Sequence, residues 1–244
     1  MQSDAKWADR GSISACMIVK NEEEMLSRCL KSIRDYVDEI IVVDTGSTDG
    51  TVSIAESFGA HVYHHTWEDN FAKHRNQSFQ YGSGGWILIV DADEELLPGA
   101  EEVLPEAMAT DEGIQGIAVS VESSFDQGRA RAQASSIRII RNHAGIRYEG
   151  RVHNYLVGVK RAVCVPIRIF HHGYDLDREA LERKFQRTTE LLKKDIEENP
   201  DNPRPHHFLG ASYLSEKMYP QALQEAEKAL LLYETRNDRC HNYL

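Results

Sequence analysis

Trp86-Ile87-Leu88-Ile89-Val90-Asp91-Ala92-Asp93 joins an apolar run to a pair of aspartates. Its first five residues are apolar at every position, which is typical of a β-strand that is buried on both faces of a sheet. Two aspartates follow two positions apart, and residues two apart in an extended chain point to the same side. We therefore expect a central strand whose carboxyl end presents two converging carboxylates.

A second stretch has the same design. Ile40 to Val43 form another apolar run, and Asp44-Thr45-Gly46-Ser47-Thr48 follows it. Gly46 lets the chain turn sharply, and we expect Ser47 or Thr48 to cap the next helix. Capping leaves Asp44 unexplained, so we predict that its carboxylate accepts hydrogen bonds from a ligand.

The first hundred residues alternate between strand and helix patterns. Short runs rich in β-branched residues mark strands at Ile13–Val19, Glu39–Asp44, His61–His64 and Trp86–Asp91. Helical spacing lies between them, over residues 25–33, 52–58 and 71–79. This alternation predicts a mostly parallel sheet in a three-layer, Rossmann-like α/β/α fold, with the two fully apolar strands at its centre. Such sheets bind ligands at the carboxyl ends of their strands.

The pattern changes after Pro98 and again at Arg178. Strand signals at residues 116–121, 136–140 and 163–170 follow one another without a long helix between them, so the sheet is expected to become mixed. The polar, aperiodic segment Glu122–Gln133 is expected to be a mobile loop. From Arg178 onward we expect only helices, the first ending near Glu198, before Asn199-Pro200.

The helical part has the spacing of one tetratricopeptide repeat, carried by Leu209-Gly210, Tyr213, Ala222 and Ala229. Stacked repeats normally support one another, so we expect this repeat to belong to a longer array. The predicted organisation is a polar tail at residues 1–12, an α/β domain at 13–176 and a tetratricopeptide-like helical region at 177–244.

Composition limits the function. The 244 residues carry a formal net charge of −11, so nucleic acid is not expected as a partner, whereas a cation site suits this charge. The apolar runs are far shorter than the ~18 residues of a membrane span, and residues 1–11 lack the apolar stretch of a secretory signal. We expect a cytoplasmic protein without a transmembrane segment.

The four cysteines form neither a CxxC pair nor a disulfide framework and are expected to be reduced and mostly buried.

The two carboxylates after the buried strand suggest a metal site. Asp91 and Asp93 offer hard oxygen ligands, which suit Mg²⁺ or Mn²⁺ with phosphate oxygens and water in the remaining positions. The alternative is an acidic turn that leads through Glu94-Glu95 into a helix. Arg75 offers a guanidinium for a pyrophosphate, whereas Lys73 is more simply explained as a solvated surface cation.

Four segments in this order resemble family 2 glycosyltransferases of the GT-A fold: SACMIVKNE at 14–22, IVVDTGSTDGT at 41–51, FAKHRN at 71–76 and IVDADE at 89–94. The resemblance implies a bound nucleotide sugar. Its base would lie at the end of the first strand and at Asp44, its diphosphate near Arg75, and its ribose and a divalent metal at Asp91 and Asp93. The implied binding residues are Val19, Lys20, Asn21, Glu22, Asp44, Gly46, Arg75, Asp91, Ala92 and Asp93.

Later segments resemble a bacterial branch of this family that continues into helical repeats: RIIRN at 138–142, YEGRVH at 148–153 and IFHHGY at 169–174. Alternation along the strand from Val163 places His171 on the inward face, where it is either a third metal ligand or a hydrogen-bonded core residue.

The chain departs from the family at Asn154, where members commonly carry an acidic residue. An inverting transferase needs a carboxylate or an imidazole to take the proton of the acceptor, and an amide cannot do so. The candidates that remain for this catalytic base are Glu149, His153 and Glu95.

These features favour a metal-dependent, inverting glycosyltransferase. It would move a sugar from a nucleoside diphosphate sugar, with UDP as the expected nucleotide, to an unknown glycan, lipid-linked or protein acceptor, with Glu122–Gln133 closing over or shaping the acceptor side. A nucleotidyltransferase would instead carry a glycine-rich loop where Val19-Lys20-Asn21-Glu22 stands. A third possibility is a non-catalytic scaffold that binds a protein partner through its repeats, and the repeats of an active enzyme could recruit such a partner as well.

Overall fold

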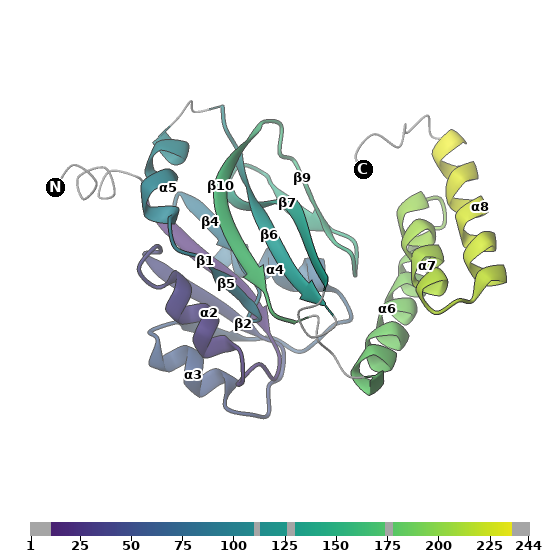
Figure 1. Ribbon diagram of the computed structural model, residues 1–244, viewed down its shortest axis with the longest axis horizontal. Coiled ribbons are helices and arrows are strands. Elements are labelled where there is room, and N and C mark those ends of the chain that lie inside the picture. Colours follow the sequence, from purple (N-terminus) through teal and green to yellow (C-terminus); the bar gives the residue numbers. More distant parts are fainter. Residues whose placement is uncertain (1–10, 110–112, 126–129, 174–177, 236–244) are drawn as a thin grey trace. The chain divides into compact units, whose positions relative to one another are not determined.

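The computed structural model describes residues 11–109, 113–125, 130–173 and 178–235, which fall into two compact units (Figure 1). The first unit takes its residues from Met1–Glu68, Lys73–Tyr148 and Leu156–Asp175. The second takes them from Asp69–Ala72, Glu149–Tyr155 and Leu176–Leu244. Two short segments from the α/β part of the sequence, Asp69–Ala72 and Glu149–Tyr155, thus belong to the same unit as the helices. Residues 1–10 of the predicted polar tail lie outside the described residues.

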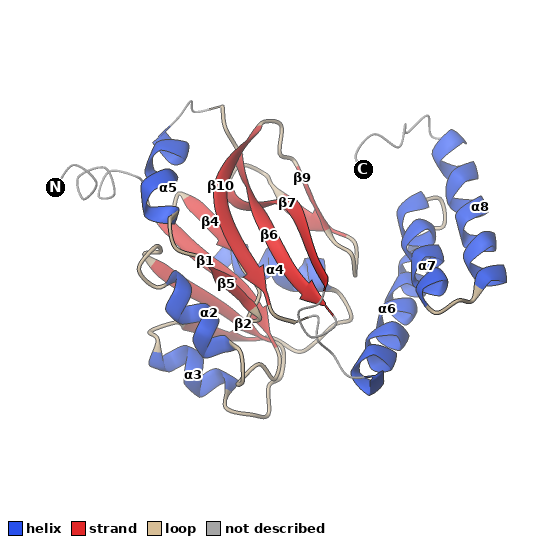
Figure 2. Cartoon of the chain, viewed as in Figure 1, coloured by secondary structure: helices blue, strands red, loops and turns tan. Residues whose placement is uncertain are grey.

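An eight-stranded sheet organises the first unit (Figure 2). Its strands are β1 (Ile13–Val19), β2 (Glu39–Asp44), β3 (His61–His64), β4 (Trp86–Ile89), β5 (Glu94–Leu96), β6 (Gly116–Phe125), β7 (Ala130–Arg141) and β10 (Ala162–His171). They lie in the order β3-β2-β1-β4-β7-β6-β10-β5. The first four are parallel, and the pairs β4/β7, β7/β6 and β10/β5 are antiparallel. The mixed second half confirms the predicted change of pattern. Strands β8 (Arg147–Glu149) and β9 (Tyr155–Val157) form a separate two-stranded sheet.

The two fully apolar strands are placed differently from each other. β4 lies at the centre of the sheet, as predicted, whereas β2 lies next to the edge strand β3 and is separated from β4 by β1. The prediction of a central position is therefore wrong for β2. Its residues from Ile40 to Asp44 are nevertheless all buried, because helices cover both faces of this part of the sheet.

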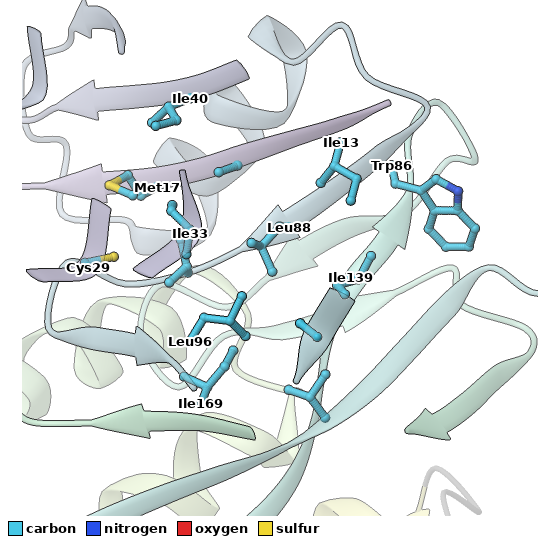
Figure 3. Packing of buried hydrophobic residues seen from close by; sticks show 14 of the residues in the cluster. Ile13, Met17, Cys29, Ile33, Ile40, Trp86, Leu88, Leu96, Ile139 and Ile169 are labelled. Atoms are coloured by element: carbon cyan, nitrogen blue, oxygen red, sulfur yellow. The ribbon is translucent and has the colours of Figure 1, made fainter. Parts of the chain in front are cut away.

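Alternate side chains of the strands enter two separate hydrophobic clusters. Met17 of β1 packs with Ile33 of α2 (Leu26–Ile33), in the cluster that Figure 3 shows. Its neighbour Cys16 points to the other face and packs with Phe79 of α4 (Phe71–Tyr81). The first cluster also takes in residues of α3 (Thr51–Ser57) and α5 (Ala100–Ala109). Helices on both faces of one sheet confirm the three-layer fold.

The mobile loop predicted at Glu122–Gln133 is wrong for the residues that the structure describes. β6 and β7 form a long antiparallel pair in which Glu122 lies opposite Gln133 and Ser123 opposite Ala132. Residues 131–135 are exposed, so this ribbon is held by its ladder of backbone hydrogen bonds and needs no apolar alternation. Residues 126–129 lie outside the described part.

The second unit contains α6 (Arg178–Glu198), α7 (Pro203–Ser215) and α8 (Tyr219–Thr235). The predicted end of the first helix at Glu198 is confirmed. A Cβ atom added at Gly210 would lie 3.2 Å from the carbonyl oxygen of Ala222, which explains the small residues where α7 crosses α8. Among the described helices, none combines the length and the apolar character that crossing a membrane requires. Of the three cysteines in the described part, Cys16 and Cys29 are buried and Cys164 is exposed.

Candidate active site

The two aspartates that follow β4 lie in a turn rather than in an extended chain. β4 ends at Ile89, and the amide of Glu94 donates to the carbonyl oxygen of Asp91 at 3.0 Å. Each carboxylate has a partner of its own: Asp91 Oδ1 lies 2.7 Å from Arg75 Nη2, and Asp93 Oδ2 lies 3.1 Å from His171 Nε2. The expectation of an extended Asp-x-Asp pair is therefore wrong.

Arg75 is held firmly at this site. Its side chain is only 13% exposed, and its guanidinium lies over the ring of Tyr148 at 5.4 Å. Burial alone would raise the pKa of Asp91, but the charges of Arg75 and Arg138 lower it, so the carboxylate stays ionised. Lys73, on the same helix, pairs at the surface with Glu68 at 2.6 Å, as its interpretation as a solvated cation predicts.

Three residues of the site, Glu94, Arg138 and Gly173, were not singled out from the sequence. Glu94 is 1% exposed, and its Oε1 accepts from Nη2 of Arg138 at 2.5 Å. A Cβ atom at Gly173 would lie 1.8 Å from Asp93 Oδ2, so the carboxylate occupies the space that only glycine leaves open. Each of the three lies in one of the segments that resemble the family, and this was the signal that could have found them. Their places in the sequence do not show which residues they contact.

The loop after β1 is joined to the loop after β2. Asn21 adopts a left-handed conformation with φ of 55°, its amide donates to Ser47 Oγ at 3.0 Å, and its Oδ1 accepts from the amide of Thr48 at 2.8 Å. The prediction that Ser47 or Thr48 caps the next helix is wrong, because α3 begins at Thr51 after Gly50 as N-cap.

Glu22, the next residue, faces other acids. Burial, and after it the negative charges of Asp93, Asp91 and Asp49, raise the pKa of Glu22 to about 7. The first loop therefore places a further carboxyl group within electrostatic reach of both motif aspartates.

Asp44 is buried and is used by its own turn. Its carboxylate accepts from the amides of Gly46 and Ser47 at 3.3 and 3.0 Å and lies 3.2 Å from His64 Nδ1. Burial would raise the pKa of Asp44, but these hydrogen bonds, those of Ser47 first, hold it below its usual range. The prediction that the turn leaves this carboxylate unexplained is wrong. Gly46 has the positive φ, 103°, that a sharp turn needs.

The remaining nucleotide-binding candidates differ in exposure. The carbonyl oxygen of Val19 accepts from the amide of Thr45 at 2.9 Å, and Ala92 has its methyl group in the core. Lys20 is exposed at the end of β1.

The three candidates for the catalytic base have different surroundings. Glu95 lies on the opposite side of β5 from the buried Glu94, and its Oε2 is 2.9 Å from His172 Nε2. His153 belongs to the second unit, where its ring stacks on Phe208 with 4.5 Å between centroids. Burial, and after it the charges of Lys184 and His207, lower the pKa of His153. Glu149 belongs to the same unit, 3.4 Å from the hydroxyl group of Tyr155.

The predicted metal ligands are brought together only in part. Ile167 and Ile169 are buried on β10, which confirms the inward face predicted for His171. His171 contacts Asp93, whereas Asp91 is engaged by Arg75. In the part of the chain that is described, no three His, Cys, Asp or Glu side chains are grouped closely enough to hold a metal by themselves.

Comparison with known proteins identifies the fold and the family. The family model described as glycosyl transferase family 2 matches residues 14–170, a range that contains Asp44, Arg75, Asp91 and Asp93. The chain belongs to glycosyl transferase family 2. The crystal structure of Staphylococcus aureus TarS 1–349 resembles this family 2 chain in fold, with a TM-score of 0.55 at 15% identity over 93% of this chain and 82% of TarS.

Two curated relatives extend over nearly all of this family 2 chain. A TPR repeat-containing protein of Synechococcus elongatus is 32% identical over 237 residues, which are 90% of this chain and 54% of the relative. The SPbeta prophage-derived glycosyltransferase SunS of Bacillus subtilis is 25% identical over 240 residues, 96% of this chain and 57% of SunS. The chain thus spans little more than half the length of these relatives.

Proposed function

We propose that this chain is a metal-dependent, inverting glycosyltransferase that transfers a sugar from a nucleoside diphosphate sugar, with UDP as the nucleotide, to an acceptor nucleophile. The observation that carries the proposal is the pairing of Arg75 with Asp91 at the end of β4, inside the region that matches family 2. A cation and carboxylates at the carboxyl ends of parallel strands are placed where such sheets bind their ligands.

In this proposal Arg75 binds the diphosphate. Asp91 and the ring of Tyr148 hold the guanidinium in place, so little side-chain freedom is lost when the donor binds. The Nε atoms of Arg75 and Arg138 are buried and lack a hydrogen-bond partner among the described residues. Both guanidinium groups pair with carboxylates of the turn at residues 91–94, and each keeps one N–H group without a partner among the described residues.

The donor set fits a divalent cation. Asp93 and His171 offer one oxygen and one nitrogen ligand that already meet, and the raised pKa of Glu22 reports negative charge that a cation would offset. We propose that Asp93 and His171 hold Mn²⁺ or Mg²⁺, with phosphate oxygens and water completing its coordination. When bound, the metal supplies charge neutralisation for the departing diphosphate.

We propose that one of Glu149, His153 and Glu95 is the catalytic base. It would take the proton of the acceptor as its nucleophile attacks the anomeric carbon. We also propose that α6, α7 and α8 form a tetratricopeptide-like region that binds a protein partner or acceptor, which the name of the Synechococcus relative supports.

The test is a calorimetric titration of UDP and GDP into the protein, with Mn²⁺ and with a chelator. UDP binding that requires Mn²⁺ and is lost in Asp91→Asn supports the proposal. Among Glu149→Gln, His153→Gln and Glu95→Gln, the variant that lacks the catalytic base should keep this binding while losing sugar transfer. Absence of nucleotide binding by the folded protein would refute it and favour a scaffold that acts through its helices.

A further inference from the structure

We infer that Arg138 is a positioning residue, which acts through Glu94 to hold the backbone of Asp91 in its binding conformation. The sequence suggested no role for Arg138. The consequence for nucleotide binding rests on the proposed function, whereas the effect on the backbone of Asp91 does not.

Arg138 is the extra residue of a β-bulge. Ile139 of β7 lies opposite Ile117 and Ile137 lies opposite Ala118, so Arg138 between them has no partner on β6. In a regular strand, Ile137 and Ile139 would share a face, but here they pack in clusters on opposite faces of the sheet. Such a bulge redirects a side chain, and here it directs Arg138 to the turn after β4.

A chain of hydrogen bonds joins Arg138 to Asp91. Arg138 Nη2 donates to Glu94 Oε1 at 2.5 Å, and the other oxygen of Glu94 accepts from the amide of Asp91 at 2.9 Å. The turn is closed from the other side by the amide of Glu94, which donates to the carbonyl oxygen of Asp91. Arg138 Nη1 is 4.0 Å from Asp91 Oδ2, so its main contact is with Glu94.

Burial makes this contact necessary. Glu94 is 1% exposed and the side chain of Arg138 is 14% exposed, so water does not supply another partner for the carboxylate. A buried carboxylate that loses the cation hydrogen-bonded to it no longer has a fixed position. Without Arg138 the amide of Asp91 therefore loses a fixed acceptor, and the carboxylate that holds Arg75 loses its fixed backbone.

The direct test is to measure amide hydrogen exchange in the Arg138→Gln protein by NMR, in the absence of nucleotide. We expect the Asp91 amide to exchange at least about tenfold faster than in the wild type, because its acceptor is no longer held. The matched control is Arg141→Gln on the same strand. Arg141 lies over the ring of Trp86 at 4.5 Å and donates to the carbonyl oxygen of Ile114, away from the turn. This control should leave the Asp91 amide protected even where it lowers overall stability.

Nucleotide titrations separate this inference from a direct contact with the ligand. Weaker UDP binding by Arg138→Gln together with fast exchange at Asp91 supports positioning. If Arg138 acts through Glu94, the double variant Arg138→Gln/Glu94→Gln should lose no more UDP affinity than the single variant with the larger loss. Weaker binding with unchanged exchange at Asp91 overturns the inference and leaves the proposed function standing. A wild type that binds no UDP refutes the proposed function, and the exchange result still decides the inference. If Arg138→Gln does not fold, Arg138→Met, which also removes the cation, must show the same faster exchange, and equal rates overturn the inference.

Discussion

Arg75 Nη2 lies 2.7 Å from Asp91 Oδ1, and this contact joins the helix on one face of the sheet to the end of its central strand. The pair is mostly shielded from water, with the two side chains 13% and 29% exposed. Because a carboxylate in this position orients the guanidinium, the arginine keeps a fixed direction before any ligand arrives. A preorganised cation of this kind is suited to a diphosphate.

Replacement of Arg75 by alanine should weaken UDP binding by about 10- to 100-fold, since a charge-assisted hydrogen bond to phosphate contributes roughly 1.5 to 3 kcal/mol. Calorimetry at constant Mn²⁺ measures the change. Lys73→Ala is the control, because Lys73 lies on the same helix and its pair with Glu68 is at the surface. An Arg75→Ala protein with wild-type affinity would show that the diphosphate binds elsewhere.

Gly173→Ala should displace the carboxylate of Asp93, because the new methyl group would lie 1.8 Å from Oδ2. We expect Mn²⁺-dependent nucleotide binding to fall about tenfold or more, because Asp93 is proposed to hold the metal. Gly85→Ala is a suitable control, since its methyl group would lie 3.9 Å from the carbonyl oxygen of Ser12, its nearest neighbour. Unchanged affinity in Gly173→Ala would mean that Asp93 is not used as proposed.

The strongly patterned half of the fold could be predicted from the sequence. The bounds of β1, β2 and β3 agree with the predicted ranges, because short β-branched runs flanked by turn residues leave few alternatives. The extension of β6 and β7 beyond the strands predicted at residues 116–121 and 136–140 was missed, because residues 131–135 are exposed and carry no apolar alternation. The turn after β4 was also missed. There the amide of Glu94 donates to the carbonyl oxygen of Asp91, so the chain turns instead of continuing as an extended strand.

Some contacts between distant segments could not be predicted. Nothing near Asp93 in the sequence indicates that Gly173 must leave room for it, and the bulge at Arg138 depends on how β7 pairs with β6. His153 was expected to be a catalytic candidate from its segment, but its ring stacks on Phe208, more than fifty positions later in the chain. Residue type and spacing predicted a site at the carboxyl ends of the strands, and tertiary pairing determined which of its candidate residues meet.

Asn21→Ala should destabilise the first unit by about 1 to 3 kcal/mol, because it removes a hydrogen-bond acceptor and places alanine in a left-handed conformation. Asn21 has φ of 55°, and its Oδ1 accepts from the amide of Thr48. Asn21→Gly loses the same hydrogen bond without the backbone strain, so urea unfolding should place it between the wild type and Asn21→Ala. Equal midpoints for the two variants would show that the strain contributes nothing.

Glu22 should make stability depend on pH in a predictable direction. Burial and the charges of Asp93, Asp91 and Asp49 raise its pKa from 4.5 to about 7 in the folded chain. The folded state therefore binds more protons than the unfolded state between these values, and the free energy of unfolding must fall as the pH rises from about 4.5 to about 7. For a partly buried group the fall should be on the order of 1 to 3 kcal/mol.

Glu22→Gln tests this dependence, because glutamine keeps the shape of the side chain and cannot ionise. Urea unfolding in the presence of a chelator should show the variant more stable than the wild type at pH 8, with the difference shrinking towards pH 4.5. Glu24→Gln, an exposed neighbour, is the control and should leave the pH profile unchanged. A Glu22→Gln profile parallel to that of the wild type would mean that the carboxyl group of Glu22 does not feel the charges of Asp91 and Asp93.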